Sequence, residues 1–362
     1  SAGAIVSLAD YAATWQTNAL TVVPNGTDKI GGVNTSVTLS TEGQSVTFVF
    51  IDSTQGWINT MDSTSNVRGN PNLVATGGTI TECGNFKIHT FTGPGTFTVT
   101  NASATAAENT VGYMVVAGGG GGSGRAGGGG GAGGFREGRN VPIDNFTASP
   151  LVANAPTNAV TVSVQAYPIT VGAAGAPGPS DEAVAPNGNP SIFATITSTA
   201  GGGGAYQAGA PGGSGGGGGR ISPHAAGNGN DPSVGPSQGN NGGTGEAPAK
   251  LAGGGGAGAS GTPASSQPGA GPGGNGVATS ITGSSVTRAG GGGGSRPNNP
   301  PDTTPAGSGG SGGGGAGAPG SPSDGTSGTI NTGSGGGGGY GISPGIGGGG
   351  GSGIVVIRYK YK

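Results

Sequence analysis

Side chains that could do chemistry are sparse and widely spaced in this sequence. Cys83, His89 and His224 are the whole complement of cysteine and histidine. A structural zinc site takes about four such ligands, so a cysteine- or histidine-based metal site is excluded and Cys83 is expected to be an inert thiol. The 15 Asp and Glu residues are scattered, and a glycosidase-like carboxylate pair would need distant residues to meet in the fold. We expect no enzymatic activity and no cofactor.

The other candidates for function are polar and aromatic residues that stand between glycine runs. Loops carry function when a rigid scaffold positions them, and aromatic residues and Arg contribute most to interfaces. We therefore predict binding contacts at Tyr206, Gln207, Arg220, His224, Asn228, Asp231, Arg296, Asn298, Asn299 and Tyr340. The alternative for each is an ordinary solvated loop residue, and for His224 an exposed side chain without a ligand.

The glycine runs that separate these residues must position them. Gly accounts for 92 of 362 residues, and 8% of residues are charged. Glycine loses the most conformational freedom on folding and has no side chain to bury, so a conventional core cannot order these runs. The runs lie at 118–124, 127–134, 201–204, 211–219, 253–258, 269–276, 290–294, 307–320, 333–339 and 345–353.

Three structures compete for the glycine runs. Collagen requires glycine at every third position, and no such register persists here. A disordered linker is the common interpretation of Gly- and Ser-rich segments, but here strands at 159–167, 169–171 and 191–197 are expected to interrupt the runs. A disordered tail also has no reason to end on the apolar segment 354–361.

The third structure is a bundle of packed polyglycine-II helices, and it is the one we predict. A polyproline-II-like helix has about three residues per turn and no internal hydrogen bonds. Packed glycine helices can bond to several neighbours through their backbones, whereas an inward side chain would push them apart. The variable segments, such as 221–241 and 296–305, then become loops at the two ends of the bundle.

The rest of the chain reads as ordinary β-structure. We predict strands at 17–23, 36–39, 45–51, 86–92, 95–100 and 111–117 from apolar, β-branched residues bounded by turn signals. The strand that includes 113–117 and the terminal strand 354–361 are expected to share one sheet. Trp15 and Trp57 are expected to fill a small core, with a sugar-stacking platform as the alternative.

The predicted fold is therefore all-β plus polyglycine-II, with essentially no α-helix. Residues 1–64 form a small β-domain, and a linker and strand-rich base at 65–117 follow it. Residues 118–353 form the glycine bundle with variable loops and a few strands, and residues 354–362 return to the base sheet. Phe135 and Tyr167 are expected to pack at the base of the bundle.

Charge and hydropathy exclude several kinds of partner. The net charge is −2, and basic residues occur singly, so no footprint for nucleic acid or an anionic membrane is visible. No apolar run approaches the roughly 20 residues that span a bilayer, so we expect no membrane insertion. Because the chain begins at Ser1 without methionine, we expect it to be the carboxy-terminal part of a longer polypeptide.

Several motifs resemble the glycine-rich domains of bacteriophage tail fibres. They are Tyr113-Met-Val-Val-Ala before a long glycine run, Gly-Gly-Phe-Arg-Glu-Gly at 133–138, Tyr-Pro-Ile-Thr-Val-Gly at 167–172, and Gly-Ser-Gly-Ile-Val-Val-Ile-Arg-Tyr at 351–359. The resemblance covers about residues 86–361. The amino-terminal segment, with Ile5-Val-Ser-Leu-Ala-Asp-Tyr and Thr54-Gln-Gly-Trp-Ile, is similar to β-modules that precede such domains.

The resemblance implies a receptor-binding tip of a tail fibre, like the distal adhesins of T-even-like phages. It implies a virion protein outside the host cell, a homotrimer, and a host receptor that is an outer-membrane protein or a surface glycan. Those adhesins attach to a separate fibre, whereas here the β-module and the glycine domain share one chain. The alternative function is a structural subunit of a bacterial or environmental extracellular filament.

Overall fold

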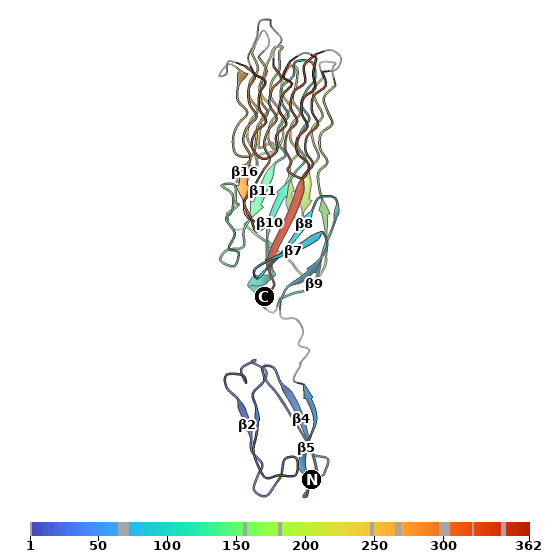
Figure 1. The fold of residues 1–362 in the computed structure, drawn as a ribbon, viewed down its shortest axis with the longest axis vertical. Coiled ribbons are helices and arrows are strands. Elements are labelled where there is room, and N and C mark those ends of the chain that lie inside the picture. The colour runs from blue at the N-terminus through green and yellow to red at the C-terminus, as the bar shows by residue number, and fades with distance from the viewer. Residues whose placement is uncertain are drawn as a thin grey trace. The chain divides into compact units, whose positions relative to one another are not determined.

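The computed structural model describes residues 2–63, 72–103, 105–154, 158–179, 183–246, 250–264, 269–296, 305–320, 322–341 and 345–362. The chain divides into two compact units, Ser1–Gly69 and Asn70–Lys362, and we describe each by itself (Figure 1). The described residues contain no α-helix, and a short 3-10 turn, η1, lies at Ala106–Asn109. The all-β fold predicted from the sequence is confirmed.

The amino-terminal unit is a three-stranded antiparallel sheet, in the order β1-β4-β5, beside the hairpin β2-β3. Its strands are β1 (Ile5–Ala9), β2 (Leu20–Val22), β3 (Val37–Leu39), β4 (Ser45–Asp52) and β5 (Gly56–Ser63). Alternate residues of β4, Val46 and Phe48, point to the core, where they meet Leu39. Trp15 and Trp57 are half-buried against this cluster.

The carboxy-terminal unit contains two larger antiparallel sheets and a hairpin. One sheet has the order β11-β10-β18-β8-β7, with β12 also paired to β10, the second has the order β15-β14-β13-β9-β6, and β16-β17 is the hairpin. The strands are β6 (Val74–Thr76), β7 (Thr79–Cys83), β8 (Phe86–Phe91), β9 (Gly95–Asn101), β10 (Thr110–Val116), β11 (Phe135–Gly138), β12 (Val160–Thr161), β13 (Ala166–Thr170), β14 (Ser191–Phe193), β15 (Ile196–Ser198), β16 (Val277–Thr279), β17 (Val286–Arg288) and β18 (Ile354–Lys360).

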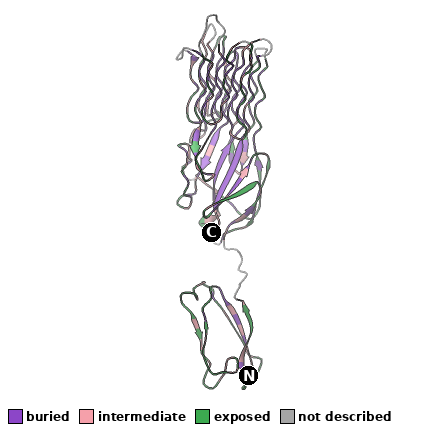
Figure 2. Ribbon diagram, viewed as in Figure 1, coloured by how far each residue is buried: buried purple, intermediate pink, exposed green. Residues whose placement is uncertain are grey.

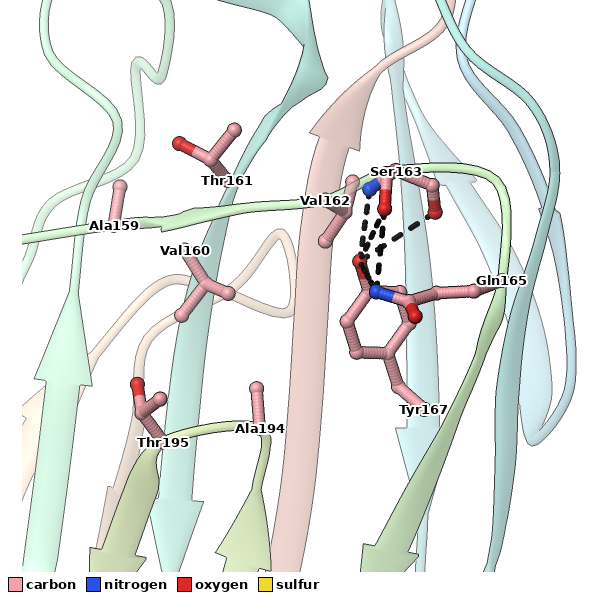
Figure 3. A pocket seen from close by; sticks show the side chains of 9 residues that line it. All are labelled: Ala159, Val160, Thr161, Val162, Ser163, Gln165, Tyr167, Ala194 and Thr195. Carbon is pink, nitrogen blue, oxygen red and sulfur yellow. Dashed lines mark hydrogen bonds between the residues drawn. The ribbon is translucent and has the colours of Figure 1, made fainter.

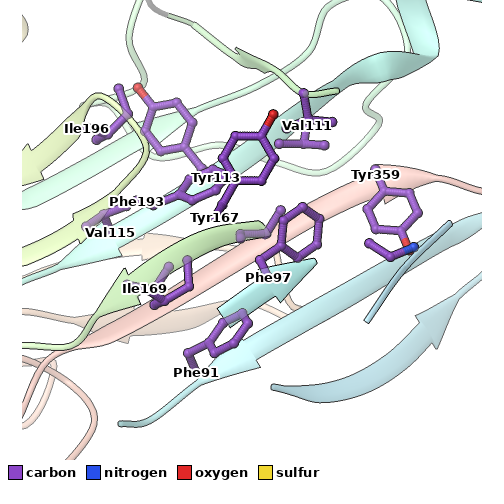
Figure 4. Packing of buried hydrophobic residues seen from close by; sticks show 14 of the residues in the cluster. Phe91, Phe97, Val111, Tyr113, Val115, Tyr167, Ile169, Phe193, Ile196 and Tyr359 are labelled. Atoms are coloured by element: carbon purple, nitrogen blue, oxygen red, sulfur yellow. The ribbon is translucent and has the colours of Figure 1, made fainter. Parts of the chain in front are cut away.

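The two sheets bury an aromatic core between them (Figure 4). Phe97, from the second sheet, is fully buried, with its ring centroid 6.1 Å from Phe193 and 6.3 Å from Tyr359. His89 packs edge-on to Phe97, and its Nδ1 lies 2.7 Å from the carbonyl oxygen of Gly77. Burial lowers the pKa of His89, so this ring is a neutral core residue.

The prediction that the first and last strands of the glycine domain share a sheet is confirmed. Val115 of β10 pairs with Val355 of β18, and the two strands run antiparallel in the middle of the first sheet. Figure 2 shows both strands buried, whereas β7 at the sheet edge is exposed. A strand that is central and covered on both faces can be apolar along its whole length, as β10 and β18 are.

Other strand predictions were wrong in detail. The predicted strand 191–197 is the hairpin β14-β15, because Ala194 turns the chain with a φ of 50°. The predicted strand 159–167 is divided between β12 and β13. Strands β6 and β7 were not predicted, since they lie in or next to a polar segment that reads as a linker, and the hairpin β16-β17 was hidden among glycine runs.

Residues of the glycine tract 118–123 bond to different neighbours in rotation, and the rotation repeats after three residues. Gly118 and Gly121 donate to the carbonyl oxygens of Asn189 and Pro186, at 3.0 Å in each case. The other amides donate alternately to the tracts 348–351 and 128–131, and the carbonyls accept from the tracts 175–178, 201–204 and 336–339. A three-residue repeat without internal hydrogen bonds is that of polyproline II, so this tract is a helix with neighbours on all sides.

Glycine stands where a neighbouring backbone leaves no room for a side chain. A Cβ atom on Gly119 would lie 2.0 Å from the carbonyl oxygen of Ser334, and one on Gly254 would lie 2.0 Å from that of Gly130. In the outer tract 172–179 the glycines at every third position are buried, and the Ala and Pro residues between them are exposed. A helix at the rim of the bundle needs glycine only on the side that faces its neighbours.

The tracts run back and forth between the sheets and a far end (Figure 1). Strand β10 leads into the tract 118–123, and the chain then turns at Arg125 and Ala126, which both have positive φ. The tract 128–133 runs back antiparallel to the tract 118–123 and leads into β11. We call the far set of turns the distal tip. Its described residues are 124–127, 206–207, 220–224, 246, 250, 296, 319–320, 322–323 and 340–341.

Candidate functional site

The distal tip gathers most of the predicted contact residues that the structure describes. Tyr206, Gln207, Arg220, His224, Arg296 and Tyr340 all lie in its turns. These residues come from tracts that are neighbours in the bundle, since Gly219 donates to Gln207 O and Arg296 donates to Ala318 O. Asn298 and Asn299 lie outside the described residues.

Asn228 and Asp231 lie at the opposite end of the bundle, near the sheets. The Asp231 N–H bonds to Gly212 O, and that of Gly212 bonds to Asn228 O. The same loop continues to Gln238, whose Oε1 accepts from the N–H of Thr199, directly after β15. One ligand at the tip therefore does not reach Asn228 or Asp231.

A small cluster of side chains stiffens the centre of the tip. Tyr206 and Leu251 are buried against Ala126, and the partly buried Tyr340 packs against this cluster. The Arg125 guanidinium lies over the Tyr206 ring, 5.9 Å from its centroid, in a cation–π arrangement. Tyr206 is 5% exposed, so it supports the tip more than it offers a contact surface.

The remaining predicted residues divide by exposure. Gln207 and Arg220 are exposed, and their neighbour Ile221 is an exposed apolar side chain. His224 is half-buried with a positive φ, and its Nδ1 lies 3.0 Å from Gly219 O, so it holds the turn in shape. Arg296 is half-buried and donates to Pro319 O at 3.2 Å, which joins two turns.

Sequence reasoning missed Arg125 and Leu251. Each is a bulky residue directly beside a glycine run, Ser-Gly-Arg-Ala-Gly at 123–127 and Lys-Leu-Ala-Gly at 250–253. A large side chain cannot lie inside the bundle, so such an interruption marks the place where a tract ends. The salt bridge between Lys250 and Glu246, with a nitrogen–oxygen distance of 3.3 Å, also lies at the tip.

Buried charges at the base of the bundle hold loops against the sheets. Arg358 of β18 lies 3.6 Å from the Asp144 carboxylate, donates to Asn145 Oδ1, and stacks on Phe86 with 4.2 Å to the ring centroid. Burial raises the pKa of Asp144 to about 6, although a hydrogen bond from the Asn140 N–H opposes the rise. The contacts tie the segment after β11 to the first sheet.

A second buried carboxylate, Glu137, joins the same segment to the hairpin β16-β17. It accepts hydrogen bonds from the Thr279 hydroxyl and, at 2.6 Å, from the Ser149 N–H. Burial raises the pKa of Glu137. Burial also lowers the pKa of Arg288, and the charge of Glu137 partly offsets that decrease. Phe135, which precedes Glu137 on β11, is fully buried in the cluster at the base of the bundle.

A cavity of about 420 Å³ lies beside β12 and the β14-β15 turn (Figure 3). Tyr167 lines it, together with the polar residues Thr161, Ser163, Gln165 and Thr195. The hydroxyl of Tyr167 accepts hydrogen bonds from the Ser163 N–H and from Gln165 Nε2, both at 2.8 Å. The Tyr167 hydroxyl is thus already committed to hydrogen bonds within the protein.

The described part of the chain contains no group of three or more His, Cys, Asp or Glu side chains placed to hold a metal ion. Within the same residues, no helix is long and apolar enough to cross a membrane.

A family model described as a glycine-rich domain matches residues 90–360. The match spans most of the chain, from the end of β8 through the glycine bundle to β18. The chain therefore belongs to this glycine-rich domain family. Neither the curated proteins nor the solved structures include a match to this chain.

Proposed function

We propose that this chain is the receptor-binding protein of a bacteriophage tail fibre, and that the distal tip binds a receptor on the host cell surface. The receptor is an outer-membrane protein or a surface glycan, and the chain acts in the virion as a homotrimer. The motifs that resemble tail-fibre domains support the phage assignment. The binding role rests on the geometry of the tip.

Hydrogen bonds between the turns at the tip are the observation that carries the proposal. Arg125 N–H bonds to Gly345 O at 2.9 Å, Ala126 N–H to Gly339 O at 3.0 Å, and Ser323 N–H to Tyr340 O at 2.9 Å. Turns that are fixed to one another lose little conformational freedom on binding, which raises affinity for a given set of contacts. Variable turns on a rigid scaffold are the usual architecture of a recognition surface.

Exposed residues of the tip supply the contacts in this proposal. The exposed Arg220 side chain ends in a planar guanidinium group, a shape that suits carboxylates, phosphates and sugar hydroxyls. Gln207 offers a donor and an acceptor beside it, and Ile221 adds an apolar surface. Arginine is one of the residue types that are enriched at the energetic centre of interfaces.

Binding of the fluorescently labelled protein to a panel of Gram-negative strains tests the proposal. The tip variant carries Gln207→Ala and Arg220→Ala, and the matched control carries Asn228→Ala and Asp231→Ala at the other end of the bundle. We expect a strain that the wild type labels, and about tenfold or more weaker labelling by the tip variant only. Equal loss in both variants, or no labelled strain, would count against the proposal.

One feature favours the alternative, a filament subunit. Strand β7 is the edge of its sheet, and its residues are mostly exposed, with Ile80 44% exposed. An exposed edge strand can pair with a strand of another chain. The oligomeric state in solution separates a closed trimer from an open filament.

A further inference from the structure

The amino-terminal unit contains a preformed hollow of about 330 Å³. It lies within the size range of about 300–1,000 Å³ that is usual for small-molecule sites. Two aromatic side chains line it, the buried Phe48 and the half-buried Trp57, together with an aliphatic wall that includes Val22 and Val23. The hollow belongs to a unit that the tip-binding proposal does not use.

Trp57 is held rigidly in this hollow. The backbone N–H of Trp57 donates to Lys29 O at 2.8 Å, and its backbone carbonyl accepts from the Gly31 N–H at 2.9 Å. The Phe50 ring contacts it edge-on, with 5.5 Å between centroids. The hydrogen bonds fix the backbone of Trp57, and the Phe50 ring packs against its indole, so the indole is already supported before a ligand binds.

Two polar side chains stand at the hollow, Asn25 and Asp28. The turn that carries them is fixed: Asp28 N–H bonds to Asn25 O at 2.9 Å, and Asn34 Nδ2 donates to Gly26 O and to Asp28 O. Within the described residues, neither the Asn25 amide nor the Asp28 carboxylate takes part in a side-chain hydrogen bond or ion pair. Both groups are therefore available to a ligand.

We propose that this hollow binds one pyranose ring of a glycan, with an acetamido substituent. The apolar face of a sugar stacks on an indole such as Trp57, and the acetamido methyl fits the aliphatic wall. Sugar hydroxyls donate to Asp28, and Asn25 can both donate and accept. A purely aliphatic ligand would leave the Asp28 carboxylate desolvated without a partner, which is costly, so the polar pair favours a sugar.

Intrinsic fluorescence of the full chain tests this site directly. Trp15 and Trp57 are the two tryptophans of the sequence, and both lie in the amino-terminal unit, so the signal reports this unit. The titrants are N-acetylglucosamine and N-acetylgalactosamine, with glucosamine as the control that lacks the acetyl group. We expect saturable changes with at least one acetylated sugar and a much weaker response to glucosamine.

Variants separate the pocket from the rest of the molecule. Asp28→Asn keeps the shape and removes the charge, and we expect about tenfold or more weaker binding, the typical loss for a charged hydrogen bond. Glu42→Gln removes an exposed carboxylate that does not line the hollow, and Gln207→Ala with Arg220→Ala alters the tip, and neither should change the affinity. An unchanged emission maximum verifies folding of each variant.

Two results would overturn the proposal. One is the absence of a saturable response to either acetylated sugar in the wild type. The other is equal affinity in wild type and Asp28→Asn, which would mean that the sugar binds elsewhere. Loss of cell labelling by the tip variant with intact sugar binding would leave this site standing, so failure here and failure of the tip proposal are distinguishable.

Discussion

A Cβ atom on Gly130 would lie 2.2 Å from the carbonyl oxygen of Gly120. The two residues belong to adjacent tracts joined by the turn at Arg125, and Gly120 donates its N–H to Gly131 at 2.9 Å. Close approach and hydrogen bonding are thus two aspects of one contact. The same relationship recurs through the bundle and explains why its interior accepts almost nothing larger than glycine.

Gly130→Ala should destabilise the bundle, whereas Gly349→Ala should not. The first pushes a methyl group into a neighbouring backbone, and we expect a loss of about 1–3 kcal/mol or more. At Gly349 the nearest atom to an added Cβ is Pro177 Cδ at 3.4 Å, so the change should be neutral or stabilise by up to about 1 kcal/mol. Calorimetric unfolding of the carboxy-terminal unit measures both, and equal effects would contradict tight packing at Gly130.

Because of Asp144, the free energy of unfolding should fall as the pH rises from about 4 to about 6. Its pKa is raised from 3.8 to about 6 in the folded state, so the folded state binds the proton more tightly and is favoured at low pH. This rise in pKa corresponds to a loss of about 3 kcal/mol in unfolding free energy across the pH window. Asp144→Asn cannot titrate, and the difference in unfolding free energy between wild type and variant should change across this window. A difference that is constant with pH would contradict the assignment.

Leu251→Ala should loosen the distal tip. Leu251 is fully buried in a cluster with Ala126 and Tyr206, and truncation of such a side chain costs about 2–5 kcal/mol. We expect faster amide exchange at Arg125 and Ala126 and weaker cell labelling, with exchange in β10 and β18 unchanged. Labelling that survives a loosened tip would contradict the need for fixed turns.

Sedimentation equilibrium should give a mass of three times 33.4 kDa for the purified chain. The trimer follows from the resemblance to tail fibres. A monomer at all concentrations would contradict it. Open-ended polymers that disappear in an Ile80→Lys variant would instead favour a filament built through the β7 edge.

The sequence predicted the general fold well because glycine runs and apolar strands differ so strongly in composition. That β10 and β18 share a sheet was predicted from two apolar strands that flank the glycine region, since each needs a partner; the register, in which Val115 pairs with Val355, was not predicted. The hairpin at Ala194 escaped prediction because a positive φ at alanine has no composition signal. Strand β6 is only three residues long and β7 is mostly polar, so their partners, rather than their own residues, determine them.

The candidate site was predicted in part. Tyr206 and Arg220 lie together at the tip as loop residues between tracts, whereas Asn228 and Asp231 lie at the other end. Consecutive loops alternate between the two ends only if every tract runs the full length of the bundle, and the sequence does not show which tracts do. Arg125 was passed over because a lone Arg between glycines resembles a chance substitution.

Amide hydrogen exchange across residues 118–353 tests the central claim, a rigid hydrogen-bonded bundle that carries exposed turns. Glycine amides such as those of Gly118, Gly121 and Gly130 have inter-tract partners and no side chain to shield them, so slow exchange can come only from the bundle. We predict slow exchange in these tracts and fast exchange at Gln207 and Arg220. Uniformly fast exchange from 118 to 353 would contradict the bundle, and it would also contradict the proposed adhesive tip, which depends on the bundle.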